Sequence, residues 1–466
     1  MIILGTNSIK DTGFDVANSC RFNSASNDHL NRTQTAGNRR KFTFSTWVKR
    51  CNPATRMALF LANRSGSNYD QFFLHEDGIL EADFYHSGTQ IFRYKTNALY
   101  RDSSAWYNII MAVDTEHDTA SSRVRIYVNG LEVTSFSTET NPSENVDTHV
   151  NENSIVAYIG SDYNSNEPDY YLAETVMLDG TQATPTDFGE FDEDSGIWKP
   201  IDITGLTYAS YSFLLDFEDS SNLGNNASGS GLADLTEAGL AATDQSTDTC
   251  TNNFATLNPL NSSSNDSHTP PTYSEGNLQS ASPSSGGGYV GSSTIGVTNG
   301  KWFWEFKKSG GSATNIYNGI GNEVGTAEIA RQSAVGVYFG NQVFYRPDGT
   351  KQIITNGSNA NSSYGASWTT NDIIGIALDL DSSTNTVTFY KNGASQGAIN
   401  LPVNTDTWFF IVACGTDTVD TWQLNFGSPP YAISSGNTDG NGYGNFEYSV
   451  PSGYYSLNTK NLAEHG

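Results

Sequence analysis

Apolar and polar residues alternate along much of the chain, and short clusters rich in Gly, Asn and Ser separate the alternating stretches. Residues 42–47 read Phe-Thr-Phe-Ser-Thr-Trp, and related stretches follow at 72–74, 80–85 and 91–95. Successive side chains of a β-strand point to opposite faces, so a period of two predicts strands rather than helices. The stretches recur about every ten residues, a spacing typical of a β-sandwich.

The clearest strand unit spans residues 106–133. An apolar stretch at 106–114 is followed by a polar break at 115–122 and by a second stretch that ends in Asn129-Gly130. Asn and Gly both tolerate positive φ, which a type I′ hairpin turn requires at two consecutive positions. The pattern therefore predicts three consecutive antiparallel strands.

A similar unit occurs in the second half of the chain. Residues 371–379 form an apolar stretch that ends in Asp, and residues 387–393 end in Tyr-Lys-Asn-Gly after a polar break. Both halves thus contain a strand that ends in Tyr-x-Asn-Gly. The predicted fold class is all-β, with two antiparallel β-sandwiches of the jelly-roll type in tandem and an irregular connecting segment.

The composition changes between the two halves. The stretch from residue 184 to about residue 274 has one apolar strand candidate at 211–217 and is otherwise rich in Asn, Ser, Thr and Gly. Residues 258–267 are typical of an exposed linker, and the best helix candidate, at 231–240, is short. The predicted domains are a first sandwich at 1–187, a connecting β and linker segment at 188–275, a second sandwich at 276–430 and a C-terminal tail at 431–466.

The chain is strongly acidic. Of its 466 residues, 24 are Lys or Arg and 50 are Asp or Glu, which gives a formal net charge of −26 at pH 7. A polyanion repels phosphate groups, so nucleic acid and anionic membranes are poor partners. Only three consecutive apolar residues follow Met1, without a basic flank, so we expect neither a signal peptide nor membrane insertion. A surface location would then require another route, such as release with a virus particle.

The four cysteines lie far apart in the sequence and form no CxxC pair. This spacing disfavours a zinc site. It leaves open one long-range disulfide, such as Cys20 to Cys51, within the set Cys20, Cys51, Cys250 and Cys414.

The motifs give no sign of catalysis. The chain has no Gly-x-Ser-x-Gly elbow, and none of its seven histidines lies beside a nucleophile motif. Glu81 and Asp83 lie two residues apart on one predicted strand and so share a face, as the two acids of a glycoside hydrolase would. Two solvent-facing carboxylates explain the same spacing, and we favour this interpretation. We therefore predict that the protein is not an enzyme.

Two sets of matching segments indicate known families. The first half, over roughly residues 15–185, resembles the laminin-G-like, concanavalin A-like family in the segments 42–48, 106–108, 126–130, 158–160 and 171–177. The second half, over about 285–430, resembles a SPRY domain in the segments 301–306, 318–321, 372–379, 389–393 and 424–427. Both resemblances imply β-sandwiches that bind partners through their loops.

The resemblance to laminin-G-like domains also implies a calcium ion at the sandwich rim, since Ca²⁺ prefers six to eight oxygen ligands. The candidate ligands are Asp162, Asn164, Asn166, Glu167 and Asp169, and a simple polar turn is the alternative. Aromatic side chains that border this loop could stack on a glycan or serve the fold, and they are Tyr163, Tyr170 and Tyr171. For Trp302 and Trp304, which share a strand face, packing in the core is the favoured interpretation.

The layout of the whole chain, including residues 188–200 and 247–254, is similar to surface proteins of marine bacteriophages. This resemblance implies a non-enzymatic tail fibre or adhesin on the virion that recognises a host-surface glycan or protein and contacts other virion proteins. A homo-oligomer is expected, a trimer if the chain is part of a fibre. The alternatives are a capsid or tail decoration protein that contacts only virion proteins, and a concanavalin-like glycoside hydrolase or depolymerase.

Overall fold

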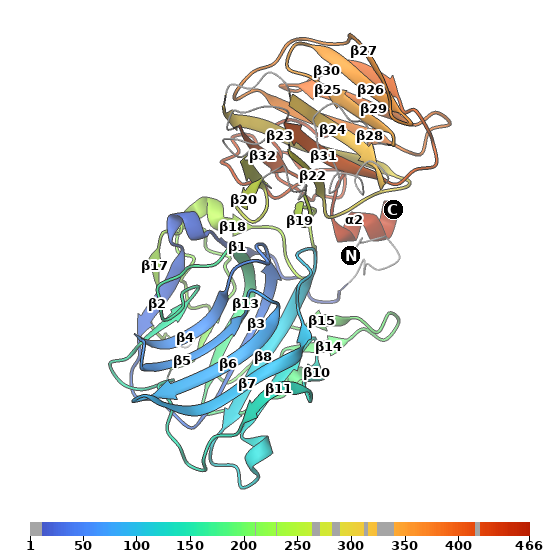
Figure 1. Cartoon of the computed structure of the whole chain (residues 1–466). Coiled ribbons are helices and arrows are strands. Elements are labelled where there is room, and N and C mark those ends of the chain that lie inside the picture. The colour runs from blue at the N-terminus through green and yellow to red at the C-terminus, as the bar shows by residue number, and fades with distance from the viewer. Residues whose placement is uncertain are drawn as a thin grey trace. The chain divides into compact units, whose positions relative to one another are not determined.

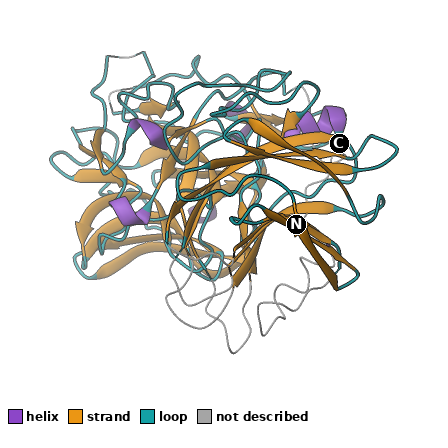
Figure 2. Ribbon diagram, turned by 90° about the horizontal axis from the view of Figure 1, so that it is seen from above, coloured by secondary structure: helices purple, strands orange, loops and turns teal. Residues whose placement is uncertain are grey.

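The regular structure is almost entirely β, with 46% of residues in strands and 5% in helices (Figure 2). The computed structural model describes residues 12–209, 211–229, 231–262, 271–281, 289–311, 316–323, 340–414 and 420–466. The described residues up to 252 form one compact unit, and those from 253 onward form another (Figure 1). Each unit contains two mainly antiparallel sheets, so the predicted all-β fold with tandem sandwiches is confirmed.

The first unit has two large sheets and a short hairpin. Its first sheet contains, in spatial order, β10 (Leu131–Glu132), β9 (Val124–Val128), β8 (Trp106–Asp114), β3 (Lys41–Arg50), β13 (Tyr170–Asp179), β1 (Ser19–Phe22) and β18 (Gln245–Ser246), and β16 (Phe213–Leu215) also pairs with β13. Its second sheet contains β11 (Phe136–Thr140), β7 (Thr89–Leu99), β6 (Ile79–His86), β5 (Asn68–Leu74), β4 (Met57–Ser65), β12 (Val156–Ile159), β2 (His29–Thr33) and β17 (Thr236–Ala238). The hairpin pairs β14 (Gly189–Phe191) with β15 (Trp198–Pro200).

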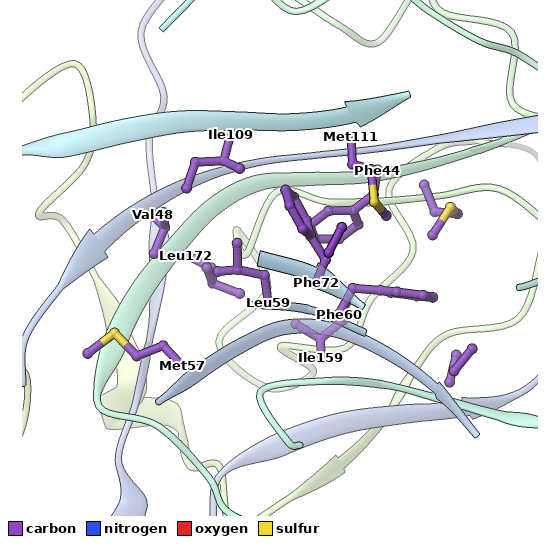
Figure 3. Packing of buried hydrophobic residues seen from close by; sticks show 14 of the residues in the cluster. Phe44, Val48, Met57, Leu59, Phe60, Phe72, Ile109, Met111, Ile159 and Leu172 are labelled. Atoms are coloured by element: carbon purple, nitrogen blue, oxygen red, sulfur yellow. The ribbon is translucent and has the colours of Figure 1, made fainter. Parts of the chain in front are cut away.

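Side chains from both sheets interdigitate in the core of the first unit. Figure 3 shows this packing, with Phe44 of β3 beside Phe60 of β4 and Phe72 of β5. All three phenylalanines are at most 1% exposed. Burial of large aromatic side chains between the sheets supplies the main driving force that holds them together.

The three strands predicted over residues 106–133 are confirmed as β8, β9 and β10. Asn129 and Gly130 have φ values of 48° and 77°, the conformation that the type I′ turn demands. In the second unit, Asn392 and Gly393 repeat this turn with φ values of 47° and 79°.

The connecting segment predicted at 188–275 contributes strands to the first unit. β16 pairs with β13, β17 pairs with β2, and β18 pairs with β1. Both sheets of the first sandwich are thereby extended by residues that follow it in the sequence. Cys20, Cys51 and Cys250 are free thiols, so the disulfide considered between the first two does not form.

The second unit also has two sheets. One contains β19 (Leu257–Ser262), β22 (Tyr289–Ser293), β31 (Trp408–Cys414), β24 (Ile316–Asn322), β25 (Gln342–Tyr345), β26 (Thr350–Thr355) and β27 (Ser358–Ser363). The other contains β20 (Thr272–Ser274), β21 (Gln279–Ala281), β32 (Thr421–Asn425), β23 (Lys301–Gly310), β28 (Ile373–Asp379), β29 (Thr386–Lys391) and β30 (Ala394–Asn400), with β33 (Tyr455–Ser456) beside β23. Residues 258–262 of the predicted linker belong to β19, and residues 263–267 lie outside the described part of the chain.

Trp302 and Trp304 are at most 1% exposed in the core of the second unit, so the prediction that they pack in the core is confirmed. The predicted C-terminal tail packs on the same unit, because Glu305 of β23 accepts hydrogen bonds from the backbone N–H groups of Glu447 and Tyr448. The short helix α2 (Thr459–His465) follows. Over the described residues, no helix has both the length and the apolar character that crossing a bilayer requires.

Candidate functional site

The second sheet of the first unit has an outer face that combines aromatic and charged side chains. In β5 and β6, Phe72, Leu74, Ala82 and Phe84 belong to the core. Because side chains alternate along a strand, the residues between them point away from the core. We call this surface the aromatic face. Its strand residues are Tyr69, Gln71, Phe73, Glu81, Asp83, Tyr85, Arg93 and Lys95. Arg56, which precedes β4, and Tyr163, from a loop, complete it.

Three tyrosines stack in a row on the aromatic face. The ring centroids of Tyr85 and Tyr69 are 5.7 Å apart with an interplanar angle of 16°. Tyr163 comes from the loop between β12 and β13, and its ring lies 4.6 Å from that of Tyr69 at an angle of 8°. All three side chains are partly exposed, although each ring turns a face toward its neighbour in the row.

Arg56, the residue before β4, lies at one end of this row. Its guanidinium carbon is 3.7 Å from the ring centroid of Phe73 and 5.5 Å from that of Tyr163. Its Nε is buried without a hydrogen-bond partner, and no carboxylate of the described residues pairs with the guanidinium. Cation–π contacts therefore hold Arg56 in place, and its charge is not neutralised.

Glu81 and Asp83 share the aromatic face, as their spacing predicts, but they are buried rather than solvent-facing, at 1% and 6% exposed. Glu81 is paired with Arg93 at 2.6 Å and with Lys95 at 3.1 Å. Asp83 accepts hydrogen bonds from the Tyr69 hydroxyl and from Gln90, each at 3.1 Å. Burial and the neighbouring Asp83 raise the pKa of Tyr69 well above its ordinary value. The two carboxylates thus hold the strands and the tyrosine row in register.

Gln71 lies between Tyr69 and Phe73 on the same face of β5. It is fully buried, and neither its amide nitrogen nor its amide oxygen has a hydrogen-bond partner among the described residues. A buried polar group without a partner destabilises a fold by roughly 1–3 kcal/mol. Because the side chain is fully buried, a ligand on the surface of this face would not reach it.

The five predicted calcium ligands do not converge on one point. Asp162 is 1% exposed, and its Oδ1 accepts hydrogen bonds from the backbone N–H groups of Asn164 and Asn166 at 2.8 and 2.9 Å. The Asn166 side chain also donates to Asp162, so its amide nitrogen faces the carboxylate. These bonds form a closed turn that carries Tyr163.

The other two acids of the loop have separate partners. Glu167 accepts a hydrogen bond from the Ser161 hydroxyl, and burial raises the pKa of Asp169 although Ser24 donates to its carboxylate. Across the described ranges, no group of three or more His, Cys, Asp or Glu side chains is placed to hold a metal ion. Calcium binding by this loop stays a prediction.

Of the three predicted aromatic contacts, only Tyr163 reaches the surface. Tyr170 and Tyr171 are 0% exposed, so the prediction that they contact a glycan is wrong. Tyr170 lies in the core and donates to the Ala58 carbonyl at 2.9 Å, and Tyr171 packs on the other side of the sheet against Trp106. The physical reason is that β13 is a central strand covered on both faces.

Four residues of the aromatic face were not predicted from the sequence as site residues: Arg56, Tyr69, Gln71 and Tyr85. The alternation within β5 and β6 contains a signal for the last three, since they lie on the face opposite to Phe72 and Phe84. Arg56 has no such signal, because its position depends on the fold around Phe73.

Comparisons with known proteins match each sandwich separately. Residues 24–174 match the model of the concanavalin A-like lectin/glucanases superfamily, and residues 301–429 match that of the SPRY domain. A comparison with curated proteins gave no match.

Similar solved structures include the SPRY domain of human HERC1, with 17% identity over 36% of this chain and 96% of that chain and a TM-score of 0.28. They also include a SAP-like pentraxin from Limulus polyphemus, with 13% identity over 37% of this chain and 80% of that chain and a TM-score of 0.28. Domains LG4-5 of the mouse laminin alpha1 chain match with 10% identity over 96% of this chain and 87% of that chain and a TM-score of 0.30. The chain therefore contains a concanavalin A-like domain, at residues 24–174, followed by a SPRY domain, at residues 301–429.

Proposed function

We propose that this protein is a non-enzymatic binding protein that recognises a saccharide on the aromatic face of its first sandwich. The observation that carries the proposal is the row of stacked tyrosines, Tyr85, Tyr69 and Tyr163, on the outer face of the first unit's second sheet. The C–H groups of a pyranose ring pack on flat aromatic rings, and a rigid sheet fixes those rings in advance.

The row can be tested by replacing Tyr163 with alanine in the full chain. We expect binding of a glycan identified on an array to weaken by about tenfold or more, because an anchoring aromatic side chain often carries 2 kcal/mol or more of the binding free energy. Tyr158→Ala, on the same sheet but outside the row, is the matched control. Equal binding by wild type and Tyr163→Ala would place the ligand elsewhere.

A concanavalin-like glycoside hydrolase is the second candidate, since Glu81 and Asp83 lie on one face. Their ion pairs with Arg93 and Lys95 favour a structural role instead. We expect no polysaccharide depolymerisation by the wild type, measured as release of reducing ends. An activity that disappears in Glu81→Gln and Asp83→Asn would overturn the non-enzymatic assignment.

We further propose that the protein is a surface component of a bacteriophage particle, as a tail fibre or adhesin, with other virion proteins as partners. The similarity of its sequence layout to phage surface proteins supports this role. Several copies on one particle would convert weak individual contacts into strong avidity. Imaging of the chain in its assembly tests the location, and sedimentation of the purified protein tests whether it is a trimer. A decoration protein, the alternative, would bind neither glycans nor host cells.

A further inference from the structure

The aromatic face carries a positive charge that its own residues do not neutralise. Arg93 and Lys95 are paired with Glu81, whereas Arg56 makes no hydrogen bond or ion pair with the described residues. The chain as a whole has 24 basic and 50 acidic residues, so a basic side chain has many potential acidic partners. An exposed part of an unpaired guanidinium is a site for an external anion.

The surroundings of Arg56 fix the orientation of its guanidinium. The group stacks 3.7 Å from the centroid of Phe73, which is fully buried, and lies 5.5 Å from that of Tyr163. Stacking occupies the faces of the planar group and leaves its edge for hydrogen bonds. A carboxylate accepts two parallel N–H bonds from that edge, and little rotamer freedom is lost because the side chain is already held.

A second polar group on this face also lacks a partner. Gln71 is two residues from both Tyr69 and Phe73 on β5, and both atoms of its buried amide are unpaired. Tyr163 lies beside both Tyr69 and Arg56, with its ring centroid 4.6 Å from that of Tyr69 and 5.5 Å from the guanidinium carbon of Arg56. A ligand that stacks on Tyr163 would therefore approach the guanidinium of Arg56.

We propose that the ligand of the aromatic face is a saccharide that carries a carboxylate, and that Arg56 binds this carboxylate while Tyr163 packs on the sugar ring. This inference rests on the proposed saccharide-binding function and adds the chemical class of the ligand. A uronic acid residue within a polysaccharide has the required chemistry: a carboxylate beside a pyranose ring.

The test compares the binding of oligogalacturonate with that of its methyl ester, in which the charge is removed and the sugar ring is kept. We expect wild-type protein to bind the acid at least about tenfold more tightly than the ester, since a hydrogen bond to a charged group contributes more than a neutral one. Arg56→Gln should lose this preference, so that it binds the acid and the ester about equally. Arg56→Lys, which keeps the charge but not the planar fork, should retain part of it.

Arg40→Gln is the matched control, because it removes one positive charge from the same unit at a side chain that is already paired with Asp147. It should bind the acid as the wild type does. If acid and ester bind equally and Tyr163→Ala weakens both, the saccharide site stands and the carboxylate inference is overturned. Binding of poly-glutamate as tight as that of oligogalacturonate would overturn it in favour of an acidic peptide. Binding of no saccharide at all would overturn both proposals.

Discussion

Replacing Lys49 with methionine is expected to lower the free energy of unfolding of the first unit by roughly 3–5 kcal/mol, because it removes the cation that is paired with a buried carboxylate. Lys49 Nζ lies 2.6 Å from Asp248 Oδ2, and both side chains are only 1% exposed. The indole N–H of Trp106 donates to the other oxygen of Asp248 at 3.1 Å and cannot replace the lost charge. Urea unfolding followed by tryptophan fluorescence measures the effect.

Two further variants separate the buried ion pair from general effects of the substitution. The double variant Lys49→Met with Asp248→Leu removes both charges and should recover most of the lost stability. Lys41→Met breaks the more exposed pair with Asp114, which is 2.7 Å long, and should cost less than about 1 kcal/mol. A loss of similar size in Lys49→Met and Lys41→Met would contradict the assigned role of Asp248.

This ion pair shows why the extent of the first unit was hard to predict from sequence. Lys49 lies in β3, whereas Asp248 lies in the segment predicted as a connection between the sandwiches. The short strands β16, β17 and β18 of that segment lack long alternating patterns, and they become strands only because the edges and the central strand of the two sheets accept them. Pairing of this kind depends on tertiary structure and leaves little local signal.

The local features were predictable because they have local causes. The Asn-Gly pairs at 129–130 and 392–393 require positive φ, and the alternation around Phe44 requires one buried face. Whether one face or both faces of a strand are buried has no such local cause, because it depends on where the strand lies in the fold. Tyr170 and Tyr171 look alike in sequence, but β13 lies centrally and both of its faces are covered, so neither reaches solvent.

The candidate site was predictable only in part for the same reason. The sequence indicates that Glu81 and Asp83 share a face and that Tyr163 lies in a rim loop. It cannot indicate that Tyr163 stacks on Tyr69, because Tyr163 lies in a loop and Tyr69 in β5, and only the folded structure brings the two together. It also cannot show that Arg93 and Lys95 neutralise Glu81 and leave Arg56 unpaired.

A second large effect is expected from Glu174→Gln, through the dependence of stability on pH. Glu174 lies where the register of β13 shifts, has a φ of 45°, and is 8% exposed beside Trp47, Phe188 and Ile203. Burial, with a smaller contribution from Asp216 and Glu218, raises the pKa of its carboxyl to about 8. Its carboxyl forms no hydrogen bond or ion pair with the described residues, so the charged form has nothing to compensate for burial.

The sign of the effect follows from the two pKa values. In the unfolded chain Glu174 loses its proton near pH 4.5, whereas in the folded chain it keeps the proton up to about pH 8. Stability contributed by the protonated form is therefore complete below pH 4.5 and declines as the pH rises to 8, by roughly 4 kcal/mol in total. Glutamine keeps the shape of the protonated side chain and does not ionise, so Glu174→Gln should lack this decline.

We expect the unfolding curves of wild type and Glu174→Gln to nearly coincide at pH 4.5 and to separate progressively towards pH 8, with the variant more stable. Urea unfolding at a series of pH values measures the difference. Glu132→Gln, which changes an exposed partner of Arg125, should follow the wild type throughout. A constant difference between wild type and Glu174→Gln from pH 4.5 to 8 would mean that Glu174 is already ionised in the folded protein. The register shift of β13 would then have to stabilise a buried negative charge rather than exclude it.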